Sequence, residues 1–243
     1  ILHQKNNFYR FLFMKKLIVL FLIVSSFQSQ AQMFGRDPII NLENWDQQRV
    51  YWGYYLGMGY YDFKFEYNEP GKDILVDNGI GFNVGLIGDL RLTEHFNLRF
   101  EPGLIFNQRD LTFPGFADED DALREVKSTY LHFPLLLKFS ATRTGNIRPF
   151  LVGGLSTALN LSSNVNNKQD NSNNVFRMVK WTNFYEVGLG VDFYLEYFKF
   201  TPSLRGVFSF NDELIRDNDP NSAWTSNVAS MKTRGVFLNF TFQ

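Results

Sequence analysis

The sequence predicts an all-β protein, an eight-stranded antiparallel up-and-down transmembrane β-barrel with an N-terminal signal peptide. Apolar and polar residues alternate with a period of two along most of the chain, as in strands that have two different faces. The connections between these segments alternate between short and long. Aromatic residues make up 17% of the 243 residues. Such an aromatic excess indicates that one face of the sheet meets lipid.

The composition excludes several classes of protein. The chain has no Cys, which removes disulfide scaffolds, thiolate metal sites, cysteine nucleophiles and a lipid-modified N-terminal Cys. Its 24 Lys and Arg nearly balance its 25 Asp and Glu, for a formal net charge of -1. A nucleic-acid-binding domain would carry a basic face, so no nucleic-acid partner is expected.

The N-terminal region has the three parts of a secretory signal. Basic Lys15 and Lys16 precede the apolar run Leu17–Val24, and Ser29–Ala31 offers a small-residue cleavage site. The sequence therefore predicts a signal peptide over 14–31, cleaved after Ala31. The alternative, an uncleaved anchor, is disfavoured because eight apolar residues are far fewer than the ~20 that a spanning helix needs.

The rest of the chain divides around this signal. Residues 1–13 are interpreted as an upstream over-call of the start site, because Ile1 is not Met and Met14 begins a well-formed signal. Residues 32–48 are predicted to be a periplasmic segment. The barrel itself is predicted over 49–243.

Eight segments carry the alternation and are predicted to be the barrel strands. In each, apolar residues occupy one face, and Gly, Asn, Ser, Thr and single charges occupy the other. In the first segment the apolar phase changes near Tyr60 and Tyr61, which predicts a β-bulge there. The predicted strands are 52–65, 80–92, 96–107, 131–140, 151–161, 184–193, 198–210 and 235–242.

The connections predict the topology. Three short links and four long ones place both termini on the same side of an eight-stranded barrel. Outer-membrane barrels have short turns in the periplasm and long loops outside the cell. The short links are 93–95, 142–147 and 195–197, and the long ones are 68–78, 113–128, 162–178 and 211–230.

The polar face distinguishes a membrane barrel from a soluble one. A soluble barrel would show dense solvated charge on its outer face. Here small residues accompany single charges of both signs, which suits the cramped interior of a barrel of about eight strands. We interpret these charges as a plug of salt bridges, rather than as a polar conduit or a gate. The predicted interior charges are Asp89, Arg91, Arg99, Glu101, Lys138, Glu186, Asp192 and Arg205.

Residues with catalytic or metal-binding chemistry are few. His132 is predicted to face inward near an outer loop, where a lone His is usually a hydrogen-bonded interior residue, whereas a catalytic one would need Ser and acid partners. The acidic run Asp118–Asp121 lacks the spacing of a calcium loop and is interpreted as a solvated loop. No catalytic, cofactor-binding or metal-binding residue is predicted, and no cofactor or small-molecule substrate is expected. Aromatic residues at strand ends are predicted to form an interfacial girdle: Trp52, Trp181, Tyr194 and Tyr197.

Several sequence blocks resemble one protein family. The chain is similar, in order from about Asn41 to Gln243, to the PorT (SprT) proteins. Departures are Gly59–Tyr61 and the Asn-rich stretch 164–174. The last strand also resembles the assembly signal of outer-membrane barrels, through Thr233, Gly235, Leu238 and Phe240. The blocks that carry the family resemblance are 41–46, 52–57, 81–85, 89–92, 97–104, 134–139, 148–154, 188–194 and 197–200.

The resemblance implies a function. PorT proteins are outer-membrane components of the Bacteroidota type IX secretion system, which exports cargo with C-terminal targeting domains and supports gliding motility. No functional residues of the family can be transferred. We therefore expect a non-enzymatic outer-membrane component whose partners are membrane lipid and other secretion proteins, bound through 32–48 or the outer loops. The alternatives are a small porin-like channel, a lipid-modifying enzyme or an adhesin.

Overall fold

The structure is a computed structural model, which describes residues 39–168, 171 and 175–243. The predicted signal peptide and the stretch before it lie outside the described residues. One compact unit comprises Asn41–Gln243. Within the described ranges no helix has the length and apolar character to cross a membrane.

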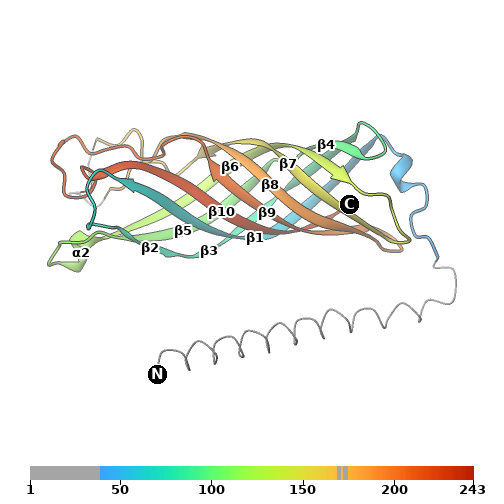
Figure 1. Cartoon of the computed structure of the whole chain (residues 1–243), viewed down its shortest axis with the longest axis horizontal. Helices are drawn as coiled ribbons and strands as arrows, with labels where there is room; N and C mark the ends of the chain where they lie inside the picture. Colours follow the sequence, from blue (N-terminus) through green and yellow to red (C-terminus); the bar gives the residue numbers. More distant parts are fainter. Residues whose placement is uncertain (1–38, 169–170, 172–174) are drawn as a thin grey trace, which may run out of the picture. The chain divides into compact units, whose positions relative to one another are not determined.

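The unit consists almost entirely of strands (Figure 1). Two short helical turns, η2 (Trp45–Gln47) and α2 (Glu119–Ala122), lie outside the strands. The strands are β1 (Val50–Tyr67), β2 (Leu75–Asn78), β3 (Ile80–Arg91), β4 (Phe96–Phe100), β5 (Gly103–Thr112), β6 (Leu123–Ser140), β7 (Ile147–Asn160), β8 (Trp181–Tyr194), β9 (Lys199–Ser209) and β10 (Val228–Phe242).

The ten described strands form a closed ring of eight barrel strands. Consecutive strands pair antiparallel, and β1 closes the ring by pairing with β10. β4 and β5 keep the same register against β3 and β6, so they are one strand interrupted around Pro102, which has no N–H to donate. β2 and β3 are likewise one strand with an extra residue near Gly79. The predicted fold class, an eight-stranded up-and-down barrel, is confirmed.

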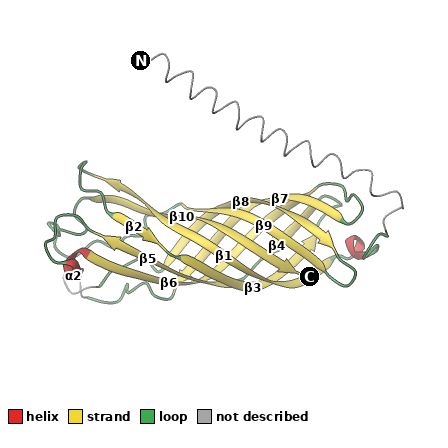
Figure 2. Ribbon diagram, turned by 90° about the horizontal axis from the view of Figure 1, so that it is seen from below, coloured by secondary structure: helices red, strands yellow, loops and turns green. Residues whose placement is uncertain are grey.

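The connections alternate as the sequence predicts. Figure 2 shows the C-terminus and the η2 turn at one end of the barrel, and the α2 turn at the other. Short links join β3 to β4, β6 to β7 and β8 to β9 at the first end. By the convention of outer-membrane barrels, this end is the periplasmic end and the long-loop end is the outer one.

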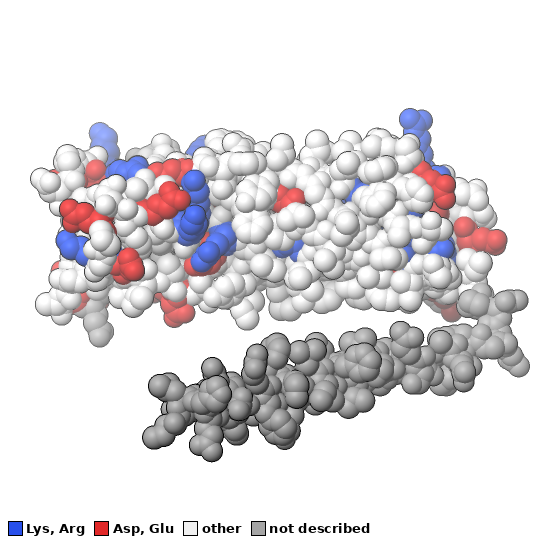
Figure 3. All heavy atoms as spheres, viewed as in Figure 1, with Lys and Arg blue, Asp and Glu red and all other residues white. Residues whose placement is uncertain are grey.

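The outer face of the barrel is apolar in its middle. Figure 3 shows few charged side chains there, while charges gather towards both ends. Large apolar side chains alternate outward along each strand; Leu86 is 65% exposed and Leu155 is 62% exposed. Exposed apolar side chains over a closed band are stable only against lipid. The apolar face that the sequence predicts to meet lipid is therefore the outer face of the barrel.

Near the outer end the two faces exchange their character. β1 continues past Tyr60 with the same register against β10, so the predicted bulge at Tyr60 and Tyr61 is wrong. The alternation is unbroken: Phe63 is buried inside, while Lys64 and Glu66 are exposed outside. What changes is the surroundings, because the strand leaves lipid for water. The register of β1 against β10 shifts only later, between Glu66 and Tyr67. A second irregularity lies in the neighbouring strand at Gly79, where a Cβ would come within 2.9 Å of the Gln108 carbonyl oxygen.

Several strands extend beyond their predicted bounds. β6 begins at Leu123 and β10 at Val228, inside the long loops that the sequence predicts over 113–128 and 211–230. The apolar alternation stops before these ends because the outward residues there are polar, as with Glu125 and Lys127. Hydropathy alone therefore marked the lipid-embedded part of each strand and missed its continuation in water.

Candidate functional site

The barrel interior holds a continuous chain of charged side chains. Asp89, Arg99 and Glu101 come from β3, β4 and the break before β5, and Arg205 and Glu186 come from β9 and β8. Inward residues of neighbouring strands share one narrow lumen, so these side chains meet although they are distant in sequence. We call this set the interior charge network.

Arginine side chains link the carboxylates of this network. Arg99 donates through Nε and Nη2 to Asp89 Oδ2, at 2.9 and 2.7 Å. Its Nη1 donates to Glu101 at 3.4 Å. Arg205 then lies 2.8 Å from Glu101 Oε2 and 3.2 Å from Glu186 Oε2. All five side chains are at most 6% exposed, so each charge depends on its partner rather than on water.

A second branch lies towards the periplasmic end. Lys138 donates to Asp192 Oδ2 at 2.6 Å, and the Thr201 hydroxyl donates to Asp192 Oδ1 at 2.7 Å. The Lys138 ammonium also lies 4.0 Å from the centre of the Phe150 ring, a cation–π contact. The predicted plug of opposite charges is therefore present in both branches, formed by charged side chains from β3, β4, β6, β8 and β9 and by Glu101 between β4 and β5.

Arg91 is the exception among the predicted interior charges. It lies at the last position of β3, at the periplasmic rim, and is only partly buried. No carboxylate of a described residue lies within ion-pair distance of it. Arg91 faces the lumen as predicted, because it lines the void beneath the cap with Lys138 and Asp192. The predicted pairing of Arg91 with a carboxylate is wrong.

His132 faces inward as predicted, but not near an outer loop. It lies at mid-strand in β6, paired across the sheet with Ala158 and Gly103, because β6 extends to Leu123. Its Nε2 is 2.8 Å from Glu186 Oε1, and its ring meets Phe184 and Phe237 edge-on.

The space around His132 is too small for a substrate. The void that His132 lines with Tyr61, Phe184 and Phe237 measures about 10 Å³. A single water molecule needs roughly that volume. The geometry of His132 therefore supports a structural role in the interior charge network, not access of a lipid or other substrate.

The periplasmic mouth is covered by the segment Asn41–Gln48, which we call the cap. Asp46 Oδ1 accepts hydrogen bonds from Tyr194 at 2.6 Å and from Arg148 at 3.2 Å. Arg143 donates to the carbonyl oxygens of Leu42 and Asn41 and lies over the Tyr194 ring. These contacts attach the cap to the turn between β6 and β7. The described part of the predicted periplasmic segment thus packs on the barrel.

Tyr194 does not belong to the predicted aromatic girdle. It is 1% exposed, and its hydroxyl points to Asp46 inside the mouth. Trp52, Trp181 and Tyr197 do lie on the outer face, as predicted, and are 75%, 51% and 82% exposed. Tyr194 is at an inward position of β8, which the alternation of Gly190 and Asp192 already indicated.

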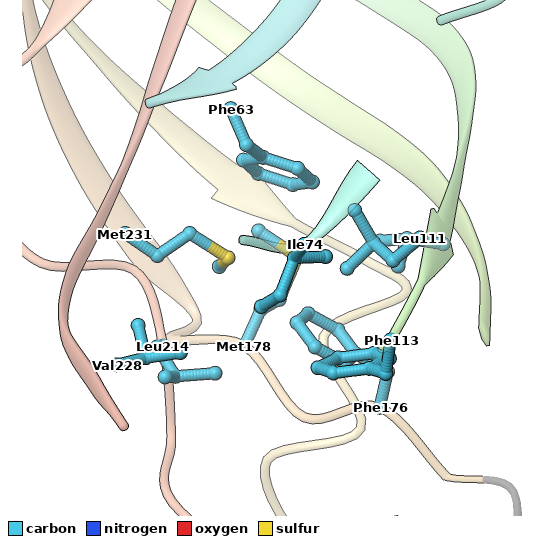
Figure 4. Close-up of a cluster of buried hydrophobic side chains, with 10 residues drawn as sticks. Phe63, Ile74, Leu111, Phe113, Phe176, Met178, Leu214, Val228 and Met231 are labelled. Carbon is cyan, nitrogen blue, oxygen red and sulfur yellow. The ribbon is translucent and has the colours of Figure 1, made fainter. Parts of the chain in front are cut away.

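An apolar plug seals the outer end (Figure 4). Inward strand residues meet residues that the long loops fold back into the barrel. The side chains labelled in Figure 4 point towards one another from the strands and the loops. The buried members are Phe63, Ile74, Leu111, Phe113, Val126, Phe176, Met178, Leu214, Val228 and Met231.

A buried acid lies beside this plug. Glu213, from the loop after β9, accepts hydrogen bonds from the Thr233 amide at 2.8 Å and from the Thr233 hydroxyl at 2.9 Å. Burial raises the pKa of the Glu213 carboxyl above its ordinary value of 4.5, although the nearby Arg109 guanidinium opposes this shift. Arg109 is fully buried, lies 3.5 Å from the centre of the Phe63 ring and donates to Thr233.

Sequence reasoning missed some of these interior residues for identifiable reasons. Arg109 is two residues beyond the inward Asn107 in β5, so extending the alternation by one step would have found it. Asp46 and Glu213 lie in segments without periodicity, so no pattern in the sequence indicated that they enter the barrel.

The acidic run Asp118–Asp121 lies at the outer end, around α2. Two of its backbone oxygens accept hydrogen bonds: the Asp120 carbonyl from Arg124 at 2.8 Å and the Asp121 carbonyl from Trp224 at 2.9 Å. Within the described ranges no three His, Asp or Glu side chains group as metal ligands.

Residues 28–214 match the family described as "Outer membrane protein beta-barrel domain". The chain belongs to this family. The match spans more than half of the chain and includes strands β1 to β9. Together with the lipid-facing band, it makes this an outer-membrane β-barrel protein. No curated protein sequence matches the chain.

Solved structures with similarity to this chain are small outer-membrane proteins. OprG from Pseudomonas aeruginosa is 16% identical, with 81% of this chain and 97% of that chain covered and a TM-score of 0.42. AlkL, solved in lipid bilayers, is 13% identical, with 79% and 87% covered and a TM-score of 0.39. The outer membrane enzyme PagL is 9% identical, with 76% and 97% covered and a TM-score of 0.35.

Proposed function

We propose that this outer-membrane barrel is a non-enzymatic component of the type IX secretion system, supporting export of cargo with C-terminal targeting domains. Resemblance of its sequence blocks to the PorT (SprT) proteins supports the assignment to that system. In this role the barrel acts through contacts with other secretion proteins. In cells that glide, the same export would also support gliding motility.

The filled lumen is the observation that supports an accessory role, in which the barrel acts by contacts and does not conduct cargo. The apolar plug, the interior charge network and the cap occupy successive levels of the barrel from the outer end to the periplasmic end. The voids beside His132 and beneath the cap measure about 10 Å³ each. A lumen filled in this way has no room for an unfolded polypeptide, far less for folded cargo. The same packing disfavours a porin-like channel.

Export in a depletion strain tests the proposal. The reporter carries a C-terminal targeting domain, and a periplasmic enzyme without that domain reports leakage of the outer membrane. We expect depletion to leave the reporter unprocessed in the periplasm, with the enzyme retained, and complementation by the wild-type gene to restore export. Unchanged export on depletion would overturn the secretion role.

Two further measurements separate the alternatives. The purified barrel is expected to give no steady conductance in planar bilayers, and a stable ohmic current would instead favour a channel. The lipid A mass of cells with and without the protein is expected to be identical, and a changed mass would instead favour a lipid-modifying enzyme.

A further inference from the structure

A polar cleft of about 470 Å³ lies at the periplasmic rim, between the cap and the turn that joins β3 to β4. We call it the rim cleft. Arg49, the residue before β1, and Arg91, the last residue of β3, line it. Gln47, Thr93 and Glu94 complete its polar wall. None of these side chains forms an ion pair of the interior charge network, although Arg91 and Glu94 also line the small void beneath the cap, beside Lys138 and Asp192.

Two arginines, Arg49 and Arg91, line the rim cleft together. Arg49 and Arg91 are directly opposite each other, joined by a backbone hydrogen bond of 2.9 Å from the Arg91 amide to the Arg49 carbonyl. Like charges directly opposite on paired strands are unfavourable. No described carboxylate lies within ion-pair distance of either side chain.

The other arginines of the compact unit each have at least one partner among the described residues. Each donates to, or forms an ion pair with, a side chain or carbonyl oxygen of a described residue. They are Arg99, Arg109, Arg124, Arg143, Arg148, Arg177, Arg205, Arg216 and Arg234. The contrast indicates that Arg49 and Arg91 are positioned for an anion that is not part of the chain.

The level of the rim cleft relative to the membrane indicates where that anion comes from. Trp52 is 75% exposed on the lipid face, and its ring packs over Gly88 of β3. Exposed Trp side chains of membrane proteins lie at the level of lipid headgroups. Arg49 is three residues from Trp52, about 10 Å along the strand towards the periplasm. Leu92 also lines the cleft and is 52% exposed. It adds an apolar side chain to the polar wall of the cleft.

We propose that the rim cleft binds the phosphate group of a glycerophospholipid from the periplasmic leaflet of the outer membrane. Arg49 and Arg91 hold the phosphate, because paired guanidinium groups match its oxygens. Glu94 supplies a carboxylate in the same cleft, so it favours a headgroup that also carries an amine, such as phosphatidylethanolamine. The acyl chains lie against the apolar face at Leu92.

Native mass spectrometry of the detergent-solubilised full-length mature protein tests this proposal. The probes are phosphatidylethanolamine, phosphatidylglycerol, soluble phosphoethanolamine and inorganic phosphate. We expect the wild type to retain phosphatidylethanolamine best. The double variant Arg49→Gln/Arg91→Gln is expected to retain about tenfold less of either lipid, as when charge-assisted hydrogen bonds are lost. Glu94→Gln is expected to remove the preference for phosphatidylethanolamine and to keep lipid binding.

A matched control removes two exposed basic residues from the outer end of the barrel. Lys64→Gln/Lys127→Gln changes the net charge equally, and both lysines lie in exposed ion pairs far along the strands from the rim. Lipid retention is expected to be unchanged. Heat-dependent migration on gels shows whether each variant is folded, so a folding defect is recognised separately.

Several results would overturn the proposal. Equal lipid retention by the folded double variant and the wild type would exclude the arginine pair as the binding site. Binding of inorganic phosphate or phosphoethanolamine as tight as that of the lipids would exclude the membrane as the source. Displacement of the lipids by an acidic peptide at micromolar concentration would assign the cleft to a protein partner.

Discussion

The middle of the barrel and its outer end are built in opposite ways. In the middle, apolar side chains face outward and the lumen holds the buried ion pairs of Arg99 and Arg205. At the outer end, Lys64 and Glu66 face outward and the lumen holds the apolar plug. The same strands run through both regions with an unbroken alternation.

This inversion shows that the solvent around a strand decides which face is polar. In lipid, an outward charge is expensive, so polar groups turn inward and must pair there. In water, the ordinary soluble pattern returns, and the buried inward face becomes an apolar core. The barrel therefore combines a membrane-spanning part held by ion pairs with an outer part held by hydrophobic packing.

The largest expected effect is at the centre of the interior charge network. Arg205→Met leaves Glu101 and Glu186 without this cation in a lumen closed to water. We expect a loss of about 3–5 kcal/mol in the free energy of unfolding, measured in detergent micelles by urea titration. Arg234→Met, which removes an exposed ion pair with Asp62, is expected to lose under about 1 kcal/mol. Equal losses in both variants would contradict the role of the network.

A packing variant tests the outer end. Leu111 is fully buried in the apolar plug. Leu111→Ala removes its contacts and leaves a cavity, so we expect a loss of about 2–4 kcal/mol by the same titration. Leu155→Ala makes the same change on the lipid face, where Leu155 is 62% exposed, and is expected to cost clearly less. A Leu155 effect as large as that of Leu111 would show that hydrophobic packing in the plug is not what stabilises this end.

The cap is expected to give a smaller and local effect. Asp46→Asn removes the charge that Arg148 and Tyr194 contact, but the Asp46 side chain is 29% exposed, so solvent weakens these contacts. We expect a loss of about 1 kcal/mol, confined to the cap. Hydrogen exchange of the amides in residues 41–48 should become faster, with the strands unchanged. Glu43→Gln, at an exposed cap position, serves as the control and should leave exchange unaffected.

The smallest expected effect is a pH dependence at the outer end. Burial raises the pKa of Glu213 in the folded protein, so the folded state holds its proton more tightly than the unfolded state does. Stability from this group is therefore fully present below about pH 4.5 and is lost as pH rises through the folded pKa. Glu213→Gln should remove that part of the slope in urea titrations at different pH values. Glu196→Gln, in a periplasmic turn, should leave the slope unchanged.

Much of the fold could be read from the sequence because side chains in a strand alternate strictly between two faces. The inward direction of Arg99, Glu186 and His132 follows from the residues beside them in the sequence, without knowledge of what these side chains contact. The alternation of short and long links likewise predicted both the ring and its orientation. The phase change at Tyr60 was misread as a bulge because periodicity reports hydropathy, and hydropathy changed when the strand left the membrane.

The sequence by itself determined that this chain is an eight-stranded membrane barrel with a polar lumen, since periodicity and link length are local properties. The tertiary structure decided which charges pair, because Arg205 meets Glu101 and Glu186 only when β9 lies across a narrow lumen from β5 and beside β8. It also decided that Asp46 and Glu213 enter the barrel from segments without regular structure. Such contacts depend on how far loops reach across a closed ring, and no periodic pattern along the chain encodes that distance.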